Sequence, residues 1–319
     1  MMQNYEGTRT SAIAAVIAGA LALVVFTGCR SQPPPDNSSR AVAPNSVNGP
    51  ARVQVEAGAP EANIDATKIV SAYNARNVGS PGWRRVVLDL FTGDSVTRSF
   101  TVVNLWHSQA DMVSTLFLLE QPPALTGTNY LLREWPGKPV EMRVSLFLPA
   151  GEQHVLEVEP SNFDEGLLGS DFSYNDIRMQ LPLIGYHYTF AGKGVLVNEP
   201  VWVVEAVPTE QQSRETVLWN KATLYLARNF AFLLGADYYK DAAIVKQMRV
   251  DSVKQIQGVW TATHITMYSA DTRRSELRLI DAEFNSSRFD VKLLSPERLP
   301  FLSNEVRNGW TTGFTNPPH

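Results

Sequence analysis

The sequence has very little cysteine: Cys29 is the only one among 319 residues, so the chain can form no disulfide within itself. Disulfides are most frequent in small secreted domains that cannot build a sufficient hydrophobic core. A chain of this length can bury enough apolar surface to fold without them. The folded part must therefore depend on its core.

The sequence also lacks an excess of positive charge. Lys and Arg total 28 against 32 Asp and Glu, and the formal net charge is −4. No basic block is present, which argues against nucleic acid as a partner and against a polybasic membrane-binding patch. Beyond the N-terminal region, no apolar run approaches the length of a membrane span.

Motifs for catalysis and metal binding are missing as well. The five histidines show no paired ligand spacing, and the sequence has no nucleophile elbow, phosphate-binding loop or dinucleotide fingerprint. We therefore expect no enzyme activity, no catalytic residue, no metal and no cofactor. Asp171 and Asp176 could form an acid–base pair, but Ser173 with Asp176 also fits a capping arrangement at a helix start.

An uncharged apolar run, residues 13–26, follows Arg9 and ends two small residues before Cys29. This layout is typical of a secretory signal peptide, with an apolar core of about 7–15 residues and a small-residue cleavage site. It resembles the lipobox of bacterial lipoproteins, which implies a signal peptide over residues 1–28 and lipid attachment at Cys29. The alternative is an uncleaved anchor, or a secretory signal with an incidental cysteine.

A lipidated Cys29 would tether the rest of the chain to a membrane, outside the cytoplasm. The next residue is Arg30 rather than the aspartate that retains enterobacterial lipoproteins on the inner membrane. By the same resemblance we expect an outer-membrane anchor in a bacterial envelope, with the chain facing the periplasm.

Residues 29–60 are rich in Pro, Ser, Asn and Ala and predict a flexible linker. Residues 61–319 are expected to form a single domain.

Most of this domain shows the period-two alternation of β-strands. Segments 83–91 and 95–105 flank the turn 92–94 and predict a hairpin, while 66–73 has helical spacing. One buried and one wet face per strand indicates an antiparallel sheet, and ten or more strands are too many for a flat one. We predict a mainly β (α+β) fold: a large curved antiparallel sheet or unclosed β-barrel, with a few short helices on its concave side.

Between the strand segments, residues 166–177 read Gly-Leu-Leu-Gly-Ser-Asp-Phe-Ser-Tyr-Asn-Asp-Ile. This stretch resembles the hallmark segment of the outer-membrane lipoprotein-sorting protein family, in the LolA/LolB-like superfamily. Weaker similarities, such as the Gly-Val-Trp turn at 258–260, follow in order along residues 65–295. The resemblance implies a structural or lid role for the signature residues Gly169, Ser170, Asp171, Phe172, Ser173, Tyr174 and Asp176.

The resemblance implies an unclosed β-barrel, lined by apolar residues and covered by helices, that holds lipid or lipoprotein acyl chains such as palmitate. The chain would then be a carrier or acceptor in outer-membrane lipoprotein or lipid sorting, working with an inner-membrane transporter or sorting partner. The alternative is an envelope regulatory or accessory module of the same fold, which binds a protein partner without lipid transfer.

Large side chains on or beside the strand segments are the candidates for contact with a hydrophobic ligand. Such side chains either fill a core or line a cavity, and the sequence leaves both open. The candidates are Trp106, Phe117, Trp202, Phe232 and Met267.

Overall fold

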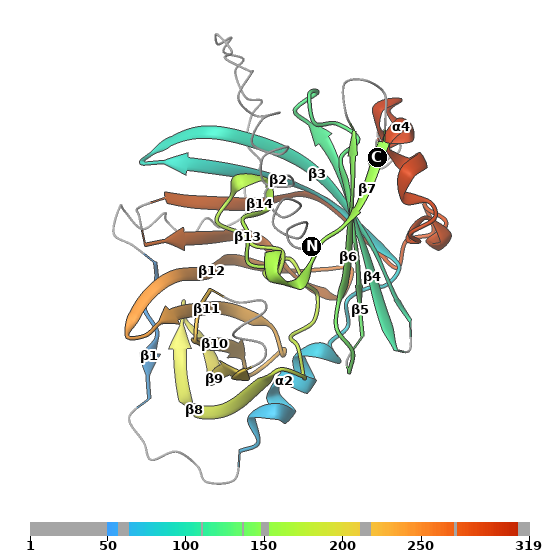
Figure 1. The fold of residues 1–319 in the computed structure, drawn as a ribbon. Coiled ribbons are helices and arrows are strands. Elements are labelled where there is room, and N and C mark those ends of the chain that lie inside the picture. Colours follow the sequence, from blue (N-terminus) through green and yellow to red (C-terminus); the bar gives the residue numbers. More distant parts are fainter. Residues whose placement is uncertain are drawn as a thin grey trace, which may run out of the picture. The chain divides into compact units, whose positions relative to one another are not determined.

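The computed structural model describes residues 50–56, 64–109, 111–135, 137–147, 153–210, 218–270 and 273–311. Within these ranges the strands form one antiparallel sheet of 14 strands, which curves strongly around its inner face (Figure 1). The expected signal peptide and Cys29 lie outside the described residues.

The sheet is formed by strands of 2 to 15 residues. Their bounds are β1 (Gln54–Val55), β2 (Gly82–Thr92), β3 (Ser95–Gln109), β4 (Met112–Gln121), β5 (Asn129–Glu134), β6 (Glu141–Phe147), β7 (Gln153–Glu157), β8 (Tyr186–Leu196), β9 (Glu199–Pro208), β10 (Lys221–Ala227), β11 (Leu233–Lys240), β12 (Ala243–Ile256), β13 (Val259–Ser269) and β14 (Arg273–Phe284). The helices are α2 (Ala66–Asn74) and α4 (Leu299–Arg307), with short 3-10 turns η1 (Pro160–Asn162), η2 (Leu167–Gly169) and η3 (Val291–Leu293).

Two runs of sequential hairpins make up the sheet. Its order is β1-β8-β9-β10-β11-β12-β13-β14-β2-β3-β4-β5-β6-β7. The runs β2–β7 and β8–β14 are joined where β14 pairs with β2, from Phe284 opposite Gly82 to Arg273 opposite Thr92. The order ends at β1 and β7, so the sheet is unclosed among the described residues. The predicted fold class and the predicted hairpin, β2 with β3, are confirmed.

Alternation along the strands separates two hydrophobic cores. On β4, Phe117 and Leu119 belong to the large inner core, whereas Leu116 and Leu118 belong to a core on the outer face. The same split follows on β5, where Leu132 faces inward and neighbouring Leu131 faces outward. The inner core also receives side chains from α2 and from the long crossover between β7 and β8.

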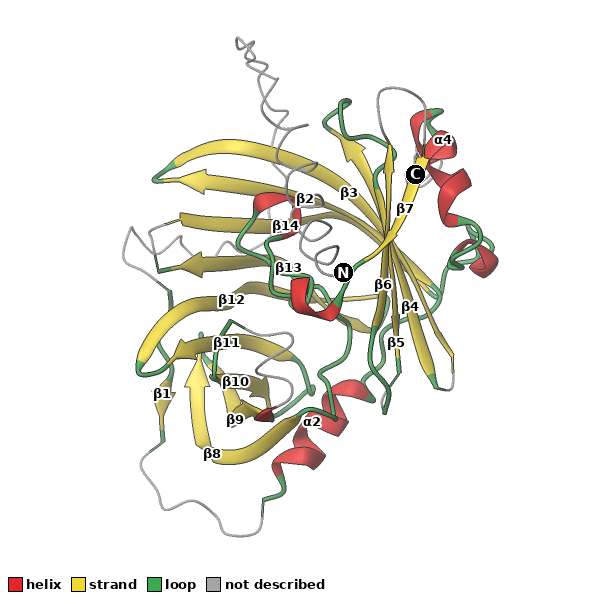
Figure 2. Ribbon diagram, in the orientation of Figure 1, coloured by secondary structure: helices red, strands yellow, loops and turns green. Residues whose placement is uncertain are grey.

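Among the described residues, α2 and α4 lie on opposite faces of the sheet. Helix α2 begins where the Asp65 carboxylate accepts a hydrogen bond from Thr67 N (2.9 Å), and it buries Ala66, Val70 and Tyr73 in the inner core. Helix α4 instead packs on the outer face (Figure 2). Its apolar stripe, Leu299, Leu302 and Val306, covers the outward leucines of β3 to β5. The expectation that the helices share the concave side therefore holds for α2 and not for α4.

Strand β1 lies within the range expected to be a linker. Gln54 and Val55 pair with Val195 and Gly194 of β8, and Arg249 Nε donates to Ala51 O (2.8 Å). A Cβ on Gly194 would lie 2.9 Å from Gln54 O, so glycine is needed for this approach. Residues 50–56 are thus held against the sheet.

None of the helices in the described ranges is long and apolar enough to span a membrane.

The packing of α4 can be tested with two neighbouring residues of the helix. Leu302 is fully buried, whereas Phe301 is 60% exposed. We expect Leu302→Ala to lower the free energy of unfolding by about 2–5 kcal/mol, because it removes buried methyl groups and leaves a cavity. Phe301→Ala should change it by less than about 0.5 kcal/mol. Urea denaturation of both variants measures the difference, and equal losses would contradict the outer-face core.

Candidate functional site

The inner face of the sheet encloses a cavity of about 210 Å³. Tyr73 near the C-terminal end of α2 and residues 175–177 at the end of the signature segment complete the lining and form the cover of the cavity. Its lining is mostly apolar and includes Val86, Leu88, Val102, Phe117, Phe172, Met248, Ile265 and Leu277. The volume is smaller than the roughly 300–1,000 Å³ of sites for drug-sized ligands and larger than the ~150 Å³ of an apolar cavity that binds benzene.

Three of the five ligand candidates line this cavity. Trp106, Phe117 and Phe232 are in its wall. Met267 is fully buried in the inner core but is not part of the lining. Trp202 also lies outside it and packs edge-on against Phe190, with the ring centroids 5.9 Å apart. A role for any of the five in ligand binding stays a prediction.

Trp106 is held in place by the loop that leaves α2. Its indole Nε1 donates to Val78 O (3.0 Å), and its ring packs at 5.6 Å against Phe284. A Cβ on Gly82 would lie 2.2 Å from Trp106 Cζ2, so the ring fits only against glycine. This wall of the cavity is therefore tightly packed.

The signature segment folds back on itself inside the sheet. Gly166 bridges to Ser173, and Leu167 N donates to Phe172 O (2.7 Å). Phe172 and Tyr174 are buried, and the Tyr174 ring lies 5.9 Å from that of Tyr130 on β5. The segment thus contributes apolar side chains to the inner core.

The two signature carboxylates are fixed by different partners. Asp176 Oδ2 accepts from Ser173 N (2.6 Å) and Ser173 Oγ (2.7 Å), and the carboxylate also contacts Tyr238 and Lys246. The Asp171 carboxylate accepts from Ser275 Oγ on β14 (2.7 Å). The helix-cap interpretation is wrong in one respect: Asp176 does satisfy a free N–H, but in a turn and not at a helix start.

Burial, together with the adjacent Asp176 carboxylate, raises the pKa of Tyr238 well above its ordinary value. Tyr238 is therefore a neutral donor to Asp176 Oδ1 (3.1 Å) at physiological pH. With Lys246 as counter-ion, Asp176 is fully engaged in holding the turn to β11 and β12.

The lining also contains polar and charged residues that were not among the sequence candidates, including Arg76, Arg84, Arg178 and Tyr238. Arg178 Nε pairs with the fully buried Glu134 (3.2 Å), whereas Arg84 Nε donates to Asn104 Oδ1 (2.8 Å). The spacing of β2 does indicate that Arg84 faces the cavity. Arg84 precedes Val86 and Leu88 by two and four positions, so strand alternation places the three side chains on one face of the sheet.

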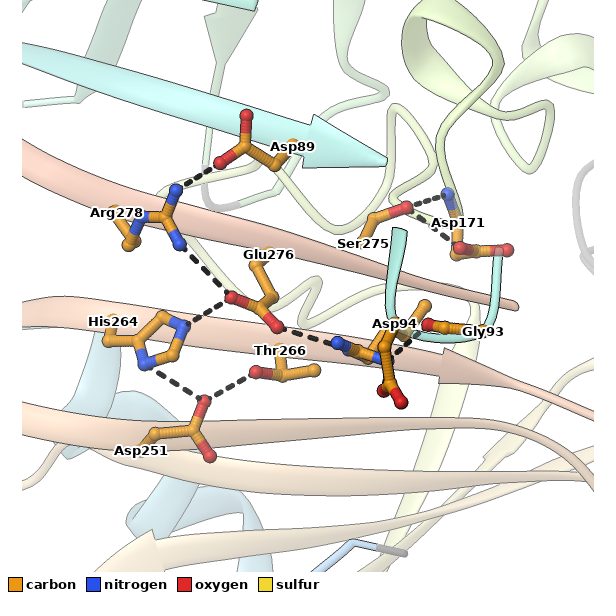
Figure 3. Close-up of polar contacts among 11 residues, drawn as sticks. Asp89, Gly93, Asp94, Asp171, Asp251, His264, Thr266, Ser275, Glu276 and Arg278 are labelled. Atoms are coloured by element: carbon orange, nitrogen blue, oxygen red, sulfur yellow. Dashed lines mark hydrogen bonds and ion pairs between the residues drawn. The ribbon is translucent and has the colours of Figure 1, made fainter. Parts of the chain in front are cut away.

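A separate polar network crosses β12, β13, β14 and β2 on the outer face (Figure 3). The His264 ring lies between Asp251 on β12 and Glu276 on β14, with Nε2 3.2 Å from Glu276 Oε2. Arg278 contacts both Glu276 and Asp89, while Asp251 accepts a hydrogen bond from Thr266 Oγ1 (2.6 Å). No group of three or more metal-ligating side chains was found in the part of the chain that the structure describes. The network is best explained as cross-strand pairing.

The partners of Asp176 give a stability prediction. Asp176 is only 3% exposed at its side chain. Lys246→Met should cost about 3–5 kcal/mol in the free energy of unfolding, because it leaves a buried carboxylate without its counter-ion. Lys221→Met is the matched control, since Lys221 and Glu205 are 38% and 37% exposed and such pairs contribute about 0–1 kcal/mol. Similar losses in chemical denaturation would mean that Asp176 does not depend on Lys246.

Asp251 gives a pH prediction. Burial raises its pKa, and Glu276 adds to the rise, while Thr266 and His264 oppose it. The native state thus binds this proton more tightly than the unfolded chain. The stabilisation is full below the unfolded pKa of about 3.9 and is lost as pH rises through the raised native value.

Asp251→Asn should therefore gain stability relative to the wild type as pH rises through this window. Thermal unfolding at a series of pH values measures the difference. The control is Asp94→Asn, whose side chain is 90% exposed. A difference that stays constant with pH for Asp251→Asn would contradict the raised pKa.

Solved structures with this fold come from several bacteria. A putative outer membrane lipoprotein-sorting protein domain from Vibrio parahaemolyticus is 19% identical, with a TM-score of 0.65 over 74% of this chain and 98% of that chain. A DUF1329 family protein from Desulfovibrio piger is 17% identical, with a TM-score of 0.64 over 73% and 97%. A LolA superfamily protein from Nitrosomonas europaea is 15% identical, with a TM-score of 0.54 over 73% and 99%.

These similarities show that the chain has the LolA-like fold that its sequence predicted. No curated protein sequence matches the chain. A model of the DUF1329-like family, described as an uncharacterized protein, matches residues 111–296, which is more than half of the sequence. The chain therefore belongs to the DUF1329-like family.

Proposed function

We propose that this protein is a non-enzymatic, periplasm-facing lipoprotein that binds acyl chains or another hydrophobic ligand on the inner face of its sheet. The observation that carries the proposal is the cavity between the strands and the α2–signature cover, with its mostly apolar lining. The similarity to the lipoprotein-sorting protein domain from Vibrio parahaemolyticus supports a role as carrier or acceptor in lipid or lipoprotein sorting.

Burial of apolar surface would hold the ligand. Each buried methylene contributes about 0.8 kcal/mol, or about 25 cal/mol per Å² of apolar area. The cavity, at about 210 Å³, accepts a short alkyl chain or part of a longer one. A whole long acyl chain needs the cover to move, at a cost of a few kcal/mol that also permits release.

The cover has a defined set of attachments that such a movement would break. Asn74 at the end of α2 exchanges two hydrogen bonds of 2.8 Å with the backbone of Leu181, and Arg76 Nη2 donates to Met179 O (2.9 Å). The signature turn is held more firmly, by the buried Asp176. Opening is therefore expected between α2 and residues 179–181.

The same proposal places the protein in the bacterial envelope. Residues 1–28 would be the cleaved signal peptide and Cys29 the lipidated anchor in the outer membrane. Of the expected linker, residues 29–60, the part before residue 50 would give the domain its reach, because residues 50–56 are held against the sheet. The acyl chains or lipids would pass between this domain and an inner-membrane transporter or sorting partner. No catalytic step is proposed, because the lining carboxylate Asp176 is committed to Lys246 and Tyr238.

Native mass spectrometry of the full chain, purified from a bacterial envelope, tests the proposal. We expect co-purifying lipid at near one per chain, identified after extraction. A mass without bound lipid, together with no uptake of added acyl probes, would contradict it. If the lipid-free protein instead co-purifies with one stoichiometric membrane protein, that result would support the partner-binding alternative.

Two variants on the same strand show whether the lipid lies in the cavity. Leu277 on β14 lines the cavity, whereas Ile280 on β14 is 60% exposed. Leu277→Trp fills the cavity and should abolish co-purification, while Ile280→Trp should leave it unchanged. If both variants lose the co-purifying lipid, or if both retain it, the lipid lies outside the cavity.

A further inference from the structure

The charges of the cavity lining and its ion-pair partners leave a net positive charge. The lining contains Arg76, Arg84, Arg178 and Asp176. Arg178 is neutralised by Glu134, and Asp176 by Lys246, and neither of these two partners is part of the lining. Arg76 and Arg84 remain, so a mostly apolar cavity carries two uncompensated positive charges.

Among the described residues, all the partners of Arg76 and Arg84 are neutral. Arg76 donates from Nη1 to Tyr73 O (2.8 Å) and from Nη2 to Met179 O (2.9 Å), and its guanidinium lies 3.7 Å from the Tyr73 ring centroid. Arg84 donates from Nε to Asn104, and its two Nη groups have no hydrogen-bond acceptor in the described ranges. A partly buried guanidinium normally has a carboxylate or another anion beside it.

The two arginines lie at one end of the cavity. Arg84 is two residues from Gly82, and Trp106, opposite Gly82, donates to Val78 in the loop that leaves α2. Nearby Asn77 is exposed, so this end meets solvent. Val86 and Leu88 follow Arg84 on the same face of β2, at about 7 Å per pair of residues. The cavity therefore runs from a positive, solvent-facing end to an apolar interior.

We propose that Arg76 and Arg84 bind the anionic head of a single-chain amphiphile, a carboxylate or a phosphate monoester, whose alkyl chain lies along β2 toward Leu88. This inference rests on the proposed function and adds to it the chemical class of the ligand. The guanidinium groups have free donors of the type that pairs with oxyanions in a bidentate manner. A neutral lipid would leave both charges desolvated and unpaired.

The electrostatics of the two arginines agree with this role. Burial, and after it the positive charge of Arg76, lowers the pKa of Arg84 to about 10, with Tyr73 opposing the shift. Arg84 is therefore charged at neutral pH but destabilised by its surroundings. An anion beside both guanidiniums would remove that cost.

Calorimetric titration of the full chain in amphipol with decanol, decanoate and decyl phosphate tests the inference. The probes share one alkyl chain and differ in the head, and the filled-cavity variant Leu277→Trp gives the background from partitioning. We expect decanoate or decyl phosphate to bind at least about tenfold more tightly than decanol, as charge-assisted hydrogen bonds would provide. The tighter of the two anions identifies the carboxylate or the phosphate as the natural head.

Substitutions then assign the preference to these residues. The double variant Arg76→Gln/Arg84→Gln should bring the ratio of anion to decanol affinity close to one while decanol still binds, which also shows an intact cavity. Arg84→Lys should retain a preference for the anion. The control is Arg143→Gln, next to inward-facing Met142 on β6 and therefore on the outer face, and should leave all three affinities unchanged.

Equal binding of decanol and the anions by the wild type would overturn the inference alone. An anion preference that survives in the double variant would do the same. Binding of none of the three probes would overturn both the inference and the proposed function.

Discussion

The pairing of β14 with β2 is the constraint on which the rest of the structure depends. It joins the last strand of the folded region to its first long strand and so turns two separate runs of hairpins into one curved sheet. The same ladder places Leu88 of β2 opposite Leu277 of β14 and Arg84 opposite Ala282, and Arg84, Leu88 and Leu277 all line the cavity. Neither run alone would enclose the cavity.

Buried carboxylates then attach the crossover segment to the inside of that sheet. Fully buried Glu134 on β5 accepts from Arg178 Nε, Met179 N and Gln180 N, and Asp176 is held by Lys246 on β12. Such groups satisfy backbone N–H donors that a segment without regular structure would otherwise leave unpaired. In the signature, Asp176 thus holds the segment in position against the sheet.

Local patterns predicted much of the fold. Alternation on 83–91 and 95–105 around a glycine turn specified the hairpin β2–β3, and the spacing of 66–73 specified α2. Alternation shows which residues share a face, but it does not show which face will be enclosed. The outer position of α4 was missed for that reason: its stripe fits any apolar surface, and the outward leucines of β4 provide one.

The site was less accessible to sequence analysis, because its lining is assembled from strands far apart in the chain. Aromatic size pointed to Trp106, Phe117 and Phe232, which do line the cavity, but also to Trp202, which does not. Arg84 was passed over because a single arginine in a strand ordinarily faces solvent. Its partner Arg76 reaches the same end from the loop after α2, a proximity that only the three-dimensional arrangement reveals.

The unclosed sheet has a consequence for how copies of this protein behave together at high concentration. An open β edge offers unpaired backbone groups to a strand of a second molecule, which is a route to aggregation. On β8 that route is obstructed. Gln54 and Val55 of β1 occupy part of the edge, and the register shift between Phe190 and Gly192 interrupts its regularity just before them. The short β1 thus protects part of an open edge without closing the sheet.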